Sequence, residues 1–169
     1  MFEVFESGSK ISKSDYKKRL PELRAELLKT QFELQKKNIP LLIIIAGVEG
    51  AGKGEVVNRL NSWMDTRFIE TNVFQNETDD EKNRPYYWRF WRKFPHAGQI
   101  GVFFGSWYTT PIKNLVFDNI SPAEFDAEMN RIKSIEQMLE AGGKLIAKFW
   151  LHIPEKKQKN RFKKLEEDE

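Results

Sequence analysis

The sequence predicts an α/β domain built on a mostly parallel central sheet. Apolar, β-branched segments alternate with amphipathic segments along the 169 residues, which is the pattern of parallel strands joined by helices. The run 41–46, LLIIIA, is apolar throughout, as expected for a central strand that is covered on both faces. A glycine-rich loop follows this run and leads into a helical segment.

The expected strands are four segments rich in β-branched or aromatic residues, at 41–46, 67–74, 98–105 and 144–153. The first helix is expected at about 14–37, with Ser14 as its cap, because leucines recur there at near-helical spacing. Further helices are expected at 53–64, at 81–94 around Pro85, and over the charged segment 154–169. Residues 106–120 should form a loop with room for a helical turn.

The segment 121–141 carries a helix start in its sequence. Ser121 suits the N-cap, Pro122 the first helical position, and Glu124 completes a capping box. Two glycines at 142–143 then end the helix.

Composition excludes several kinds of protein. With no cysteine and only two histidines, disulfides and thiolate zinc sites are ruled out, and a histidine zinc site is not expected. The net charge of +3 is too small to indicate nucleic acid binding, and no apolar run is long enough for a membrane helix. The N-terminus lacks the apolar core of a signal peptide. We therefore expect a single soluble, cytoplasmic domain over residues 1–169, with its core at about 40–169.

The loop after the first strand has the spacing of a phosphate-binding P-loop (Walker A). Gly47, Gly52 and Lys53 satisfy G-x-x-x-x-G-K between a buried strand and a helix. Backbone N–H groups and the lysine are expected to cradle phosphate through Gly47, Gly50, Ala51, Gly52, Lys53 and Gly54. Gly54 stands where a hydroxyl residue commonly holds Mg²⁺, so Glu49 becomes the candidate metal ligand. An exposed acidic loop residue is the other interpretation of Glu49.

Three further segments occur in a recognisable order after the loop: RPYYWRFWRKFP, GSWYT and AKFWLHIP. With them, the chain from about residue 12 to residue 165 resembles the polyphosphate kinase 2 family, and in particular the N-terminal half of its tandem-domain polyphosphate:AMP phosphotransferases. The resemblance implies a three-layer P-loop kinase-like fold, phosphoryl transfer from inorganic polyphosphate to AMP, and Mg²⁺ as cofactor. It also implies a homo-oligomer or a second fused domain of the same family as partner.

The family pattern F-D-R-S-W-Y-N-R here occupies residues 103–110, which are FFGSWYTT, and two of its departures remove charged side chains from the end of the strand. Phe104 replaces the aspartate and Gly105 the arginine, and Phe104 is expected to be buried and unable to hold a metal. In the glycine loop, Glu49 stands at the family's aspartate and Lys53 at its lysine, and the resemblance makes both catalytic. The family's lid follows the last helix, and the resemblance implies that these 169 residues do not include it. Either the chain is a fragment of a longer protein, as we expect, or another part of the protein supplies the lid.

The remaining candidates for nucleotide or polyphosphate binding are Arg84, Arg89, Trp107, Tyr108 and Lys148. Arg89 matches the family's arginine after the aromatic pair, although an exposed arginine is the alternative. Trp107 and Tyr108 either wall a nucleotide pocket or pack under the loop. Lys148, within an apolar strand, is either paired or faces a site. The basic run 156–164 is a solvated helix face or a guide for a polyanion.

Two functions remain open from the sequence. The complete loop favours a phosphotransferase. Phe104 and Gly105 favour an accessory domain that binds phosphate and supports an active partner domain or oligomer.

Overall fold

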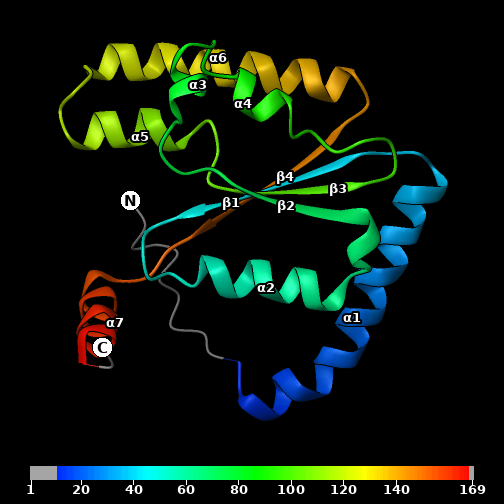
Figure 1. The fold of residues 1–169 in the computed structure, drawn as a ribbon. Helices are drawn as coiled ribbons and strands as arrows, with labels where there is room; N and C mark the ends of the chain where they lie inside the picture. The colour runs from blue at the N-terminus through cyan, green and yellow to red at the C-terminus, as the bar shows by residue number, and fades with distance from the viewer. Residues whose placement is uncertain (1–10, 168–169) are drawn as a thin grey trace.

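The computed structural model of the chain describes residues 11–167, which form three layers around a four-stranded parallel sheet (Figure 1). The strands are β1 (Leu41–Gly47), β2 (Ile69–Val73), β3 (Ile100–Phe104) and β4 (Leu145–Leu151), in the order β2-β3-β1-β4. Ile43 is in register with Val102 on one side and Ala147 on the other, which makes β1 a central strand. The expected α/β class and parallel sheet are confirmed.

Helices cover both faces of this sheet. One face carries α1 (Lys13–Lys36) and α2 (Lys53–Trp63), and the other carries α3 (Asp79–Lys82), α4 (Trp88–Trp91), α5 (Thr109–Val116) and α6 (Pro122–Ala141) (Figure 1). A short 3₁₀ turn, η2 (Thr66–Phe68), precedes β2. The last helix, α7 (Glu155–Glu167), lies off the edge of the layers and close to the loop between β1 and α2 (Figure 1).

The core follows the alternation of side chains along β1. Ile43 and Ile45 pack toward α1 and α2 with Leu34 and Val57, whereas Leu42 and Ile44 pack toward α4 and α6 in an aromatic-rich cluster. That second cluster contains Phe90, Phe103, Trp107, Ile132 and Leu139. Because both faces of β1 are buried, its sequence is apolar at every position, as a central parallel strand requires.

β4 is an edge strand and is covered less well than its neighbours. Leu145, Phe149 and Trp150 are about half exposed, whereas β3 is buried from Ile100 to Phe103. Within residues 11–167, no helix has both the length and the apolar character that crossing a bilayer requires.

Three local expectations were wrong. The single helix expected at 81–94 is divided into α3 and α4, because Pro85 lacks an N–H and restricts Arg84 before it. The segment 106–120 contains the eight-residue helix α5 rather than only a turn. The cap of α1 is Ser12, whose hydroxyl accepts from the Asp15 N–H, and not Ser14. The other helices and the four strands lie within a few residues of their expected bounds, and the capping box of Ser121 and Glu124 is present. Residues 168–169 of the expected last helix lie outside the described part of the chain.

Candidate functional site

The glycine loop joins the end of β1 to the start of α2. Gly47 has φ +133°, and a Cβ on it would lie 2.0 Å from the Leu151 carbonyl oxygen, so only glycine fits between β1 and β4. The Val48 N–H then donates to that same carbonyl at 3.1 Å. Gly52, in the left-handed region at φ +91°, is the N-cap of α2. The loop therefore ends at a helix N-terminus, where backbone N–H groups favour an anion.

Lys53 is folded back onto the loop. Its Nζ donates to the carbonyl oxygens of Gly47 and Val48, each at 2.9 Å. Burial lowers the pKa of Lys53 below its ordinary value, and the nearby charge of Glu49 offsets part of this effect. The Ala51 N–H is also engaged within the loop, because it donates to the Val48 carbonyl at 3.3 Å.

Two cavities flank Lys53. The larger, about 620 Å³, is bordered by Glu49, Lys53, Phe104 and Arg161 among others. The smaller, about 260 Å³, lies between the loop and the end of β3, and its lining includes the aromatic residues Phe74, Phe104, Tyr108 and Trp150. Glu49 borders both cavities, and Lys113 is a second lysine that borders the smaller one. The loop thus faces two adjoining spaces at the carboxyl ends of the strands, where open α/β sheets bind ligands.

Phe104 and Gly105 end β3 beside these cavities. Phe104 is only partly buried and borders both of them, so the expectation of a buried side chain was wrong. It is the last residue of β3, in register with Ile45 on one side and Val73 on the other, at the end of both ladders. Gly105 has φ +83°, and a Cβ there would lie 2.6 Å from the Phe74 carbonyl oxygen. The backbone at Gly105 therefore has no room for the side chain that the family pattern places there.

Trp107, Tyr108 and Lys148 come together behind the smaller cavity. Trp107 is completely buried against Phe90 and Phe103, so it packs under the site and does not wall a pocket. Tyr108 does border the smaller cavity. Lys148 is paired rather than free to face a site, since its Nζ lies 2.6 Å from the Glu136 carboxylate.

Glu136 was missed by the sequence reasoning. It lies on the buried side of α6 with Ile132 and Leu139, and its carboxylate accepts from Trp107, Tyr108 and Lys148. A signal was present in the sequence, because a glutamate at helical spacing from Ile132 and Leu139 places a charge on the apolar face.

The two arginines predicted from the aromatic segment have different surroundings. Arg89 is 8% exposed, lies 3.3 Å from the Glu81 carboxylate, and donates to the Gln75 carbonyl at 3.0 Å. It borders a further cavity of about 620 Å³ together with Asn72. Arg84 is exposed, pairs with Asp80 at 3.6 Å and stacks on Trp88, as a solvated arginine does.

Helix α7 contacts the loop directly, which the sequence reasoning did not anticipate at the level of single residues. Gln158 Nε2 donates to the Glu49 carbonyl at 2.8 Å, and Arg161 donates to the Gly50 carbonyl.

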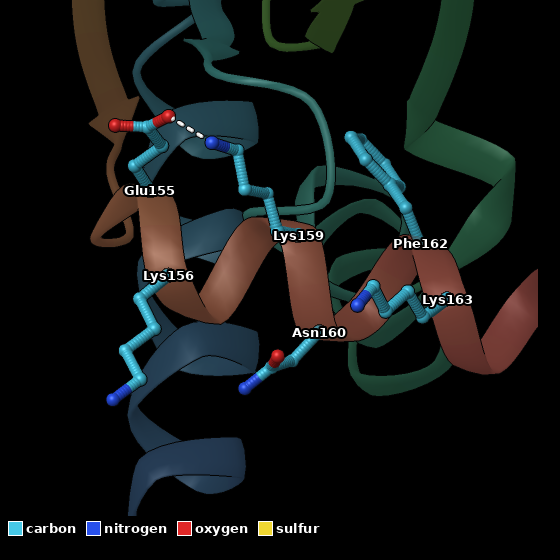
Figure 2. A pocket seen from close by; sticks show the side chains of 6 residues that line it. All are labelled: Glu155, Lys156, Lys159, Asn160, Phe162 and Lys163. Atoms are coloured by element: carbon cyan, nitrogen blue, oxygen red, sulfur yellow. Dashed lines mark ion pairs between the residues drawn. The ribbon is translucent and has the colours of Figure 1, made fainter.

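A hollow on α7 is bordered by Lys156, Lys159 and Lys163. Figure 2 shows Lys159 directed toward Glu155, at 2.6 Å, while Lys156 extends away from this pair. Much of the basic run 156–164 is therefore presented on the surface next to the loop.

A parallel sheet with a glycine loop between β1 and α2, and a lysine at the start of that helix, defines a P-loop kinase-like domain. Residues 10–169 match the family profile described as Polyphosphate kinase 2 (PPK2), and the chain belongs to this family.

Similar proteins agree with this assignment. The chain is 46% identical over 169 residues to a polyphosphate:AMP phosphotransferase of Pseudomonas aeruginosa, covering 99% of this chain and 34% of that protein. It is 30% identical over 154 residues to a GDP-polyphosphate phosphotransferase of Mycobacterium tuberculosis, covering 91% and 52%. A crystal structure of polyphosphate kinase 2 from Arthrobacter aurescens superposes with a TM-score of 0.86 at 30% identity, covering 95% and 59%. The chain thus spans about a third to a half of the length of the curated relatives.

Proposed function

We propose that this domain transfers a phosphoryl group from inorganic polyphosphate to a nucleotide, with AMP as the acceptor and ADP as the product. The observation that carries the proposal is the position of Lys53, at the start of α2 and between two cavities. Phosphoryl transfer depends mainly on positioning and charge stabilisation. A lysine reached from two sides can contact a group that passes from a donor on one side to an acceptor on the other.

The larger cavity suits the polyphosphate donor. Arg161 borders it, and the same helix carries Lys156, Lys159 and Lys163 on its surface. A chain of phosphates needs an extended basic surface, and α7 offers one that begins at the loop. Gly50 and Gly52, which border this cavity, place loop backbone against the donor.

The smaller cavity suits the nucleotide acceptor. Its aromatic walls offer flat apolar surface to a base, and Lys53 and Lys113 offer charge to a phosphate. Arg89 lies across the segment 73–75, which borders both this cavity and its own. We assign Tyr108 and Arg89 to the acceptor side, and Glu49 to the boundary between the two substrates.

The residues present fit Mg²⁺ only as an ion shared with substrate phosphates. Within the described residues, no three His, Cys, Asp or Glu side chains form a cation site. Mg²⁺ is commonly held by one or two carboxylates together with phosphates, and Glu49 supplies one carboxylate beside the loop. Bound there, the ion would supply neutralisation of phosphate charge. The chain's own part is the contact of Lys53 and the loop N–H groups with the transferred group.

A second function is favoured by Phe104 and Gly105. An aromatic ring occupies the end of β3 where the family pattern has a carboxylate, and Gly105 excludes the arginine beside it. The domain would then bind phosphate and support a second domain of the same family or a second copy of the chain. Because the curated relatives are longer than this chain, the proposal includes a second domain as the partner.

The test incubates the chain with polyphosphate, AMP and Mg²⁺ and measures ADP, alongside Lys53→Met. We expect Lys53→Met to lower the rate at least a hundredfold, because the charge that meets the transferred group is removed. Lys133→Met, at an exposed position on α6, is the matched control and should keep the wild-type rate. Polyphosphate that stabilises the wild type against heat without forming ADP would indicate the accessory function. If the wild type shows neither turnover nor stabilisation by polyphosphate, both functions are overturned.

A further inference from the structure

The Glu136 carboxylate joins three donors from two separate parts of the chain. Oε1 accepts from the Tyr108 hydroxyl at 2.7 Å and from Trp107 Nε1 at 3.3 Å, and Oε2 lies 2.6 Å from Lys148 Nζ. Lys148 Nζ also donates to the Tyr108 hydroxyl at 3.2 Å. Glu136 itself is 7% exposed. Since a buried carboxylate is stable only when it is paired and hydrogen-bonded, these contacts hold one another in place.

The network fixes the turn between β3 and α5 from behind. Trp107 is buried in the aromatic cluster, and Tyr108 is the N-cap residue of α5. In front of this turn, Tyr108, Thr109 and Lys113 border the smaller cavity next to Lys53. The same tyrosine therefore borders the cavity and donates its hydroxyl to Glu136.

We infer that Glu136 is a positioning residue for the nucleotide acceptor, which acts by holding Tyr108 and the first turn of α5 against the smaller cavity. This inference rests on the proposed function. Glu136 lies behind the turn and needs no contact with the substrate. Substituting Glu136 should weaken binding of the acceptor and not of the donor, because the larger cavity is bordered by neither Tyr108 nor α5.

A carboxylate is required for this role, and an amide of the same shape would not replace it. All three partners of Glu136 donate hydrogen bonds. Glutamine has one accepting oxygen and an NH₂ group, which would face either the Lys148 ammonium or the Trp107 indole N–H, and both of these groups can only donate. Burial and the neighbouring Glu136 both raise the pKa of the Tyr108 hydroxyl, which therefore stays protonated and able to donate.

The experiment compares Glu136→Gln, Tyr108→Phe, the double variant and a matched control in the same ADP-forming assay. The control is Glu140→Gln, one turn further along α6 and exposed. We expect Glu136→Gln to raise the KM for AMP about tenfold, the loss of roughly one buried charged hydrogen bond, and to change the KM for polyphosphate less than twofold. The KM for AMP of the double variant should not exceed that of the more affected single variant, because both changes break the same contact, the one between Glu136 and the Tyr108 hydroxyl.

Three results would overturn the inference. These are an equal rise in both KM values, a lower rate that only follows the fraction of folded protein, and additive effects in the double variant. Thermal unfolding of each variant measures the folded fraction.

Failure of the proposed function would be recognised separately. If the wild type forms no ADP, the same variants are compared by calorimetric titration with AMP and with polyphosphate. A selective, tenfold weaker affinity for AMP in Glu136→Gln then supports the positioning role without turnover. No AMP binding by the wild type would overturn the positioning role, since no acceptor would be held.

Discussion

Replacing Gly105 by alanine should destabilise the domain by about 2–5 kcal/mol. Its φ of +83° is a conformation that costs an L-residue about 1–2 kcal/mol relative to glycine. The added Cβ would also lie 2.6 Å from the Phe74 carbonyl oxygen. Phe74 cannot easily withdraw, because its N–H donates to the Phe104 carbonyl at 2.9 Å. Relieving such an overlap in a packed region costs about 1–3 kcal/mol more.

Urea unfolding followed by tryptophan fluorescence measures this difference in the free energy of unfolding. Gly54→Ala is the matched control, because no atom lies within 4 Å of a Cβ built at Gly54 and this residue is inside α2. We expect the control to equal or exceed the wild type by up to about 1 kcal/mol, since alanine suits a helix better than glycine. A Gly105→Ala variant within about 0.5 kcal/mol of the wild type would refute the strain argument. Introducing arginine here should likewise destabilise the fold and not restore the family's pattern.

Two further predictions concern buried polar groups away from the loop. Gln31→Leu should lower the free energy of unfolding by about 2–4 kcal/mol. The reason is that the Gln31 side chain accepts from the Asp65 N–H at 2.8 Å and donates to the Asp65 carbonyl at 2.9 Å. A loss below about 1 kcal/mol in urea unfolding would contradict this. Tyr87→Phe should leave stability unchanged or raise it by up to about 1 kcal/mol at pH 7, because the Tyr87 hydroxyl is buried with no hydrogen-bond partner in the described structure. Burial raises the pKa of Tyr87 to about 12 from 10.0, so the native state holds the hydroxyl proton more tightly than the unfolded state does. The free energy of unfolding therefore falls as the pH rises from 10 to about 12, where only the unfolded state loses this proton. Unfolding measured across that range should show a smaller decline in Tyr87→Phe, and an equal decline would refute the assignment.

The sequence predicts the first half of the site well because its parts are consecutive. Strand β1, the glycine loop and α2 follow one another along the chain, so their order and spacing alone place Lys53 at a helix start beside Gly47. The apolar run of β1 likewise indicates its central place in the sheet before any contact is known. These features depend on local sequence and on rules for parallel sheets.

The second half of the site depends on contacts between distant segments, and there the sequence was less informative. Glu136 meets Lys148 and Tyr108 only because α6, β4 and the turn after β3 pack together. Trp107 was equally compatible with a pocket wall and with the core, and only the packing of Phe90 and Phe103 around it decides between the two. Arg161 reads as one more charge in a basic run, although it contacts the Gly50 carbonyl.

The hydrogen bonds of Lys53 have a consequence for any measurement of ligand affinity. In this structure the ammonium already satisfies the carbonyls of Gly47 and Val48, so a phosphate that recruits it must displace contacts rather than add to them. The observed binding free energy is then the difference between two occupied arrangements of the same lysine. A substitution that removed the amine would also leave the carbonyls of Gly47 and Val48 without this donor. Weak residual binding of phosphate to Lys53→Met would therefore reflect a loop that has lost two internal hydrogen bonds as well as its charge.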